Sequence, residues 1–155
     1  YDYACVRISG TFVWSKRVGP VKLPKLEPIA NTIVYVAGWA YSTVTDLHDV
    51  DYEFPLLEGR LKWVSRKKCA AGWDAYNIAE WTNRMACVLD NGRRKSFCNG
   101  EWGDSVVSDG VFHGMVAAGS GTCSFSDVPI MVVTIAPVTD WVVNVTGLAH
   151  EKESN

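Results

Sequence analysis

The chain has 155 residues, of which 48% are hydrophobic and 21% are charged, and its formal net charge at pH 7 is −2. A chain of this length can bury a core and form one domain. The small negative charge gives no reason to expect binding to nucleic acid or to an anionic membrane. No apolar run approaches the roughly 20 residues of a membrane-spanning helix.

The amino-terminal third predicts extended structure. Residues 1–8 (YDYACVRI) alternate apolar and polar side chains, which is typical of a half-buried β-strand. Proline and glycine are dense up to residue 24, and this density predicts a linker. Further strands are predicted where β-branched and aromatic residues gather, over 31–39, 61–64 and 85–89.

Two helical segments are predicted, a short turn from Ser65 to Cys69 and a helix over 137–148. Pro137 suits the first turn of that helix, and apolar residues recur at helical spacing after it. Asn144 begins an Asn-Val-Thr glycosylation sequon. It lies beside the apolar stripe, so we expect that Asn144 can carry a glycan.

Five cysteines in a chain of this size indicate an oxidising compartment, although their spacing does not give the pairing. No two of them have C-x-x-C spacing, which argues against a zinc site. We therefore expect neither a metal nor a cofactor.

Residues 98–114 (CNGEWGDSVVSDGVFHG) carry the most specific pattern of the chain. The segment resembles the active-site region of the chymotrypsin-like serine proteases, in which C-x-G-D-S-G-G-P precedes an apolar pair, a turn and a strand ending in H-G. The matching positions align without a gap, and they are Cys98, Gly100 of the oxyanion loop, Gly103, the turn 109–111, and His113-Gly114.

The positions that depart from the family are those that carry the chemistry. Trp102 stands where the family has its nucleophilic serine, and Glu101 replaces the aspartate before it. Asp104 and Ser105 stand in place of Gly-Pro. Since an indole has no nucleophilic group that forms an acyl-enzyme, we predict that the chain is not an enzyme but an inactive serine protease homologue.

An alternative places the nucleophile at Ser105, because Gly103-Asp104-Ser105 spells the family's G-D-S three residues later. That alignment needs an insertion and a compensating deletion. It also puts Val106-Val107 where the family uses two glycines to let backbones approach closely. The alternative function is an active serine hydrolase.

The resemblance runs from Asp2, at the position of the triad aspartate, to the C-terminal helix, but it covers only the second half of the family's fold. It implies an all-β chain: the second six-stranded antiparallel β-barrel of the chymotrypsin-like fold, with a C-terminal α-helix. The implied divisions are the triad-aspartate strand and inter-barrel linker in 1–24, the barrel in 25–136, and the helix and tail in 137–155.

The resemblance also implies a specificity pocket that is filled. Ile130 replaces a glycine, and extra volume in a packed space costs about 1–3 kcal/mol. Phe97 puts a ring where the family uses a small residue. The implied pocket residues are Ser96, Phe97, Ala117, Ala118, Gly119 and Ile130.

Two disulfides follow from the resemblance, Cys69–Cys87 and Cys98–Cys123, and they leave Cys5 unpaired. In the family its position is a buried aliphatic residue. The two interpretations of Cys5 are a buried thiol that packs as a small apolar side chain and a bond to another chain.

The function predicted from this resemblance is that of a secreted, non-proteolytic protease homologue that binds or regulates other proteins. A storage or structural protein is a weaker alternative. Because an isolated second barrel would expose an apolar face, we predict a partner. It would be the missing N-terminal barrel, retained as a second chain of a cleaved precursor, or else a self-associated copy.

Overall fold

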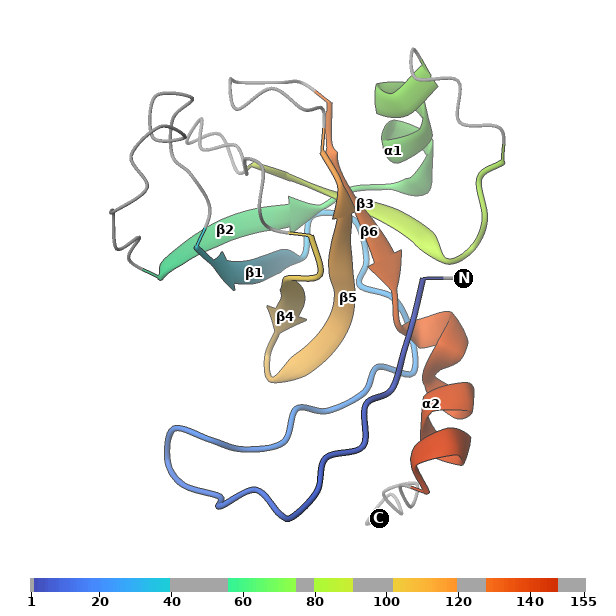
Figure 1. The fold of residues 1–155 in the computed structure, drawn as a ribbon. Helices are drawn as coiled ribbons and strands as arrows, with labels where there is room; N and C mark the ends of the chain where they lie inside the picture. Colours follow the sequence, from blue (N-terminus) through green and yellow to red (C-terminus); the bar gives the residue numbers. More distant parts are fainter. Residues whose placement is uncertain (1, 40–55, 75–79, 91–101, 120–127, 148–155) are drawn as a thin grey trace, which may run out of the picture.

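The computed structural model describes residues 2–39, 56–74, 80–90, 102–119 and 128–147. Its strands form a closed barrel in the order β1-β2-β3-β6-β5-β4, and all neighbouring pairs are antiparallel (Figure 1). The strands are β1 (Ile33–Gly38), β2 (Leu57–Trp63), β3 (Met85–Asp90), β4 (Ser105–Ser108), β5 (Val111–Ala118) and β6 (Ile130–Thr134). With the helix that follows, this architecture confirms the predicted fold class.

The barrel interior is filled by alternate residues of the strands. In β1, Val34, Val36 and Gly38 are buried while Tyr35 between them is exposed, as the two-residue period of a strand requires. The buried core brings together side chains from all six strands. Its members are Val34, Val36, Leu61, Trp63, Ala86, Val88, Val106, Val116 and Val132, with Ile130 packed against them.

A second apolar cluster lies beneath helix α1 (Arg66–Trp73), which is longer than the predicted turn. Ser65 caps the helix by accepting a hydrogen bond from the Lys68 backbone N–H. Cys69 in α1 is joined to Cys87 in β3 by a disulfide, as the resemblance implies. The indole of Trp73 donates to the main-chain oxygen of Pro129 at 2.7 Å. These contacts fix α1 against the barrel.

The amino-terminal segment does not form the half-buried strand predicted over residues 1–8. Residues 2–8 pair with no strand, and the side chain of Val6 is 87% exposed. Residues 4–22, here called the arm, are all exposed and extend away from the barrel as a long loop (Figure 1). The arm touches the barrel where Lys22 pairs with β5 next to Val111. The prediction failed because alternation makes a strand only when a neighbouring strand pairs with it.

The C-terminal helix starts later than predicted. A 3₁₀ turn (Ala136–Val138) leads into α2 (Thr139–Thr146), which ends at Gly147 in the left-handed conformation. No α2 residue is buried, and Trp141 is 43% exposed. The predicted apolar stripe is therefore largely open to solvent. Asn144 is exposed as well. Neither described helix is long and apolar enough to cross a membrane.

Candidate functional site

Trp102 and Gly103 form the turn that leads into β4. Gly103 has a φ of 93°, a conformation that glycine adopts at little cost. Its N–H donates to the main-chain oxygen of Val116 at 2.8 Å, and the Val116 N–H donates to that of Asp104 at 2.9 Å. These bonds anchor the turn on β5. They leave the side chain of Trp102, which is 73% exposed, facing solvent.

The carboxyl group of Asp104 occupies the space left by the missing side chain of Gly38 in β1. A Cβ atom at Gly38 would collide with Oδ2 of Asp104. That oxygen is buried and has no hydrogen-bond partner among the described residues. Because burial disfavours the charged form, it raises the pKa of the Asp104 carboxyl group above its ordinary value. The turn thus carries an unpaired acid at its base.

Asp104 should make stability depend on pH. Its folded-state pKa is raised, so its contribution is complete below the unfolded pKa of about 4 and is lost as pH rises through the folded value. An Asp104→Asn variant cannot ionise there. We expect it to be more stable than wild type at pH 7, with the advantage vanishing near pH 4. Urea unfolding at both pH values checks this, and an equal difference at both would contradict it.

Ser105 begins β4 directly after this acid, with an exposed side chain opposite Met115. Within the described ranges, His113 is the histidine of this region, and its ring packs edge-on against Trp63 with centroids 6.3 Å apart. Its Nδ1 is buried without a partner, and burial lowers the pKa of the imidazole. No described interaction joins His113 to Ser105, so the described residues give Ser105 no general base.

The predicted pocket residues fall partly within the described ranges. Ala117 and Ala118 are half-buried at the end of β5, and Gly119 follows in an exposed position. They lie close to Trp102, because the turn is bonded to Val116 of the same strand. Ile130 starts β6 and packs against the barrel core. The other predicted site residues lie outside the described residues, namely Ser96, Phe97, Cys98, Gly100, Glu101 and Cys123.

Asp2 and Cys5 lie at the amino-terminal end of the arm, and both are exposed. The thiol of Cys5 is free. The buried-thiol interpretation is therefore wrong, because the segment has no strand beside it that would cover Cys5. A bond from Cys5 to another chain stays a prediction, as does the role of Asp2.

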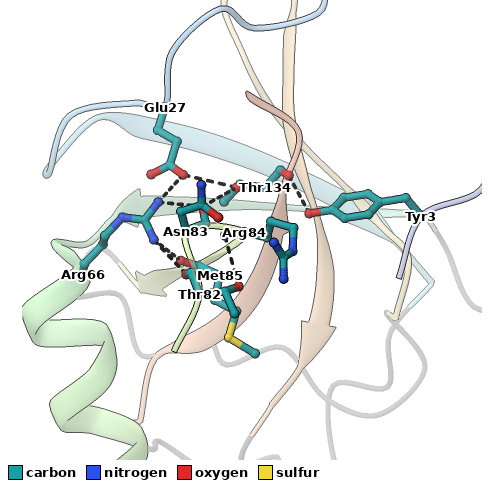
Figure 2. Close-up of polar contacts among 8 residues, drawn as sticks. All are labelled: Tyr3, Glu27, Arg66, Thr82, Asn83, Arg84, Met85 and Thr134. Carbon is teal, nitrogen blue, oxygen red and sulfur yellow. Dashed lines mark hydrogen bonds and ion pairs between the residues drawn. The ribbon is translucent and has the colours of Figure 1, made fainter. Parts of the chain in front are cut away.

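A polar network that no sequence motif indicates ties the amino-terminal end of the arm to the barrel (Figure 2). The Tyr3 hydroxyl donates to the main-chain oxygen of Thr134 at 2.7 Å. The Thr134 hydroxyl donates to Oε1 of Glu27 at 3.2 Å, and the Arg66 guanidinium donates to the same oxygen at 2.5 Å. These four residues are far apart in the sequence and belong to no motif, so no local signal could have found the network.

Arg66 extends the network to the loop before β3. Its guanidinium also donates to the main-chain oxygens of Thr82, Asn83 and Met85 at 3.0, 2.8 and 3.0 Å (Figure 2). A planar guanidinium can hold several acceptors at fixed angles. One side chain therefore fixes both that loop and Glu27. Within the described ranges, no group of acidic, histidine or cysteine side chains is arranged to hold a metal ion.

Comparison with known proteins shows what this barrel is similar to. A family model described as Trypsin matches residues 1–142. Trypsin 5G1 of Aedes aegypti is 29% identical over 150 residues, which cover 96% of this chain and 54% of that protein. Trypsin beta of Drosophila erecta is 28% identical over 143 residues, which cover 92% and 54%. The chain spans about half the length of the curated relatives it matches.

A solved protease structure is also similar to this chain. Neuropsin, a serine protease expressed in the limbic system of mouse brain, matches with a TM-score of 0.69 at 25% identity, covering 86% of this chain and 56% of that one. These findings overturn the prediction that the chain is not an enzyme, because the matched family and the named relatives are proteases. A loss of activity is not shown by any of these similarities. The assignment of Trp102 to the nucleophile position stays a prediction.

Proposed function

This chain belongs to the trypsin family, and we therefore propose that its exposed arm binds a protein partner outside the cell, in a binding or regulatory role. The partner we propose is the complementary first barrel of a trypsin-like protein. The described residues form one closed barrel, and the matched relatives are about twice as long as the chain. The disulfide between Cys69 and Cys87 supports an extracellular location.

The observation that carries the proposal is the apolar surface of the arm. Its large hydrophobic side chains are exposed, namely those of Val6, Ile8, Phe12, Val13, Trp14, Val18 and Val21. The rings of Phe12 and Trp14 stack with centroids 5.3 Å apart, and aromatic pairs of this kind often anchor interfaces. Proteins that act alone rarely expose large contiguous apolar patches. We propose that a protein partner covers the exposed apolar side chains of the arm.

The charge of the arm indicates what kind of surface the partner presents. Residues 4–22 contain four basic side chains and no acidic one, the basic residues being Arg7, Lys16, Arg17 and Lys22. Complementary potentials steer two proteins together and select the correct partner. We therefore propose that the partner presents an apolar surface with an acidic rim.

A photo-cross-linking amino acid in place of Trp14 tests the proposal in the natural assembly. We expect a covalent adduct with a polypeptide of different sequence, because Trp14 would lie within the interface. The same group in place of Tyr35, on the exposed side of β1, is the matched control and should give little adduct. Adducts only with a second copy of this chain, or equal adducts from both positions, would overturn the choice of partner.

A second candidate function is serine hydrolysis through Ser105. It is favoured by the exposed hydroxyl of Ser105 directly after the acid Asp104, in a chain whose family is enzymatic. Serine nucleophiles need an adjacent base, which the partner would have to supply. A fluorophosphonate adduct at Ser105 of the assembled protein, absent from Ser105→Ala, would support this candidate. An assembled protein without that adduct would exclude it.

A further inference from the structure

Both ends of the arm are held by one buried residue, Thr134 in β6. Tyr3 precedes the arm, and its hydroxyl donates to the main-chain oxygen of Thr134. Glu27 follows the arm, and its carboxylate accepts from the Thr134 hydroxyl. Thr134 itself is completely buried. The two contacts use different groups of Thr134, so they do not compete.

The arm is therefore a loop whose flanking residues, Tyr3 and Glu27, are both bonded to Thr134. Between Tyr3 and Glu27, main-chain hydrogen bonds to the rest of the molecule lie near the end of the loop. Lys22 pairs with Gly110 and Phe112 at 3.0 and 2.9 Å, and the main-chain oxygen of Pro24 accepts from the Thr139 hydroxyl at 2.7 Å. Closing a loop of this length costs entropy. The hydrogen bonds at Thr134 offset that cost in the free chain, before any partner binds.

We propose that Tyr3 and Glu27 are positioning residues that clamp the arm on Thr134 and so fix the surface that the arm presents to its partner. This inference rests on the proposed function, since the docking surface is the arm itself. A surface ordered in advance binds more tightly, because less conformational entropy is lost on association.

The anchoring point is itself rigid. The Thr134 N–H donates to the main-chain oxygen of Arg84 at 2.9 Å, and the preceding residue, Val133, pairs with both β3 and β5. The Arg66 guanidinium donates to the same Glu27 oxygen that accepts from Thr134, and it also donates to three main-chain oxygens (Figure 2). The clamp is therefore built on groups that the barrel itself holds in place.

The Tyr3 end of the clamp should respond to alkaline pH. Burial raises the pKa of the Tyr3 hydroxyl above its ordinary value; Arg84 lowers it, while Asp2 and Glu27 raise it further. A raised pKa means that the contribution is complete below the unfolded pKa of about 10 and is lost as pH rises through the folded value. The clamp therefore holds at neutral pH and opens only as pH rises through the raised pKa of Tyr3.

A nitroxide spin label on the free, exposed thiol of Cys5 reports on the clamp in the full chain without a partner. We expect Tyr3→Phe to increase the mobility of the label, because it removes the hydroxyl that donates to the main-chain oxygen of Thr134. Thr134→Ser, which keeps the hydroxyl, should behave like wild type, and so should Tyr35→Phe on β1. In wild type the mobility should rise as pH passes through the raised pKa of Tyr3, whereas in Tyr3→Phe it should be high throughout.

The same variants are then measured in the complex. Loss of one net hydrogen bond corresponds to about a tenfold change, so we expect Tyr3→Phe to weaken partner binding about tenfold. Unchanged label mobility in Tyr3→Phe would overturn the clamp whether or not a partner exists. Increased mobility with unchanged affinity would overturn the positioning role. A chain with the predicted mobilities but no partner would instead contradict the proposed function.

Discussion

Replacing Gly114 with alanine should destabilise the barrel by about 2–3 kcal/mol. Gly114 lies in β5, and a Cβ atom there would collide with a methyl group of Val132 and lie 2.6 Å from the main-chain oxygen of Val133. Both neighbours belong to β6, which is paired with β5 on one side and β3 on the other. Because backbone cannot rotate away as a side-chain tip can, the strands must separate or shift.

Gly119→Ala is the matched control, since it adds the same atom one residue beyond β5. A Cβ atom at Gly119 meets nothing within 4 Å, so this variant should be close to wild type. Urea unfolding of both variants gives the comparison. Equal stabilities would mean that β5 and β6 do not approach each other as described.

Replacing Trp14 with alanine should weaken partner binding by at least about thirtyfold, since truncating an aromatic anchor commonly costs 2 kcal/mol or more. Trp14 stacks on Phe12 and is 57% exposed in the free chain, so the variant removes contact area without opening the core. Stability of the free chain should change little. Titration calorimetry with the partner measures the affinity.

Leu56→Ala is the control for this experiment. Leu56 is 59% exposed, but it lies just before β2 rather than in the arm. Its replacement should leave the affinity unchanged. If Leu56→Ala weakened binding as much as Trp14→Ala, the interface would have to lie on the barrel wall, and the docking role of the arm would be wrong.

The barrel could be predicted from the sequence because its signals are local or carried by a specific motif. The alternation in β1, with Val34 and Val36 inward, marks a strand by itself. The resemblance carried by the 98–114 motif added the number of strands and their antiparallel closure into a barrel, which alternation alone does not give. The pairing of Cys69 with Cys87 likewise came from the resemblance and not from spacing.

The arm and the network could not be predicted because they depend on contacts between distant residues. Alternation over residues 1–8 carries no information on whether a neighbouring strand exists, and the exposure of Val6 shows that none covers it here. The helical period after Pro137 predicted the helix, but it carries no information on what packs against the apolar stripe, and Trp141 is 43% exposed. Thr134 joins Tyr3 and Glu27 across 131 and 107 positions of sequence.

The mass of the native assembly in solution tests the central claim most directly. Light scattering on protein isolated under non-denaturing conditions should give a mass well above the 17.1 kDa of this chain. Denaturing gels should then resolve a second chain of different sequence. A single species of 17.1 kDa that binds no hydrophobic dye would contradict the claim, because it would mean that the arm has no apolar surface left for a partner to cover.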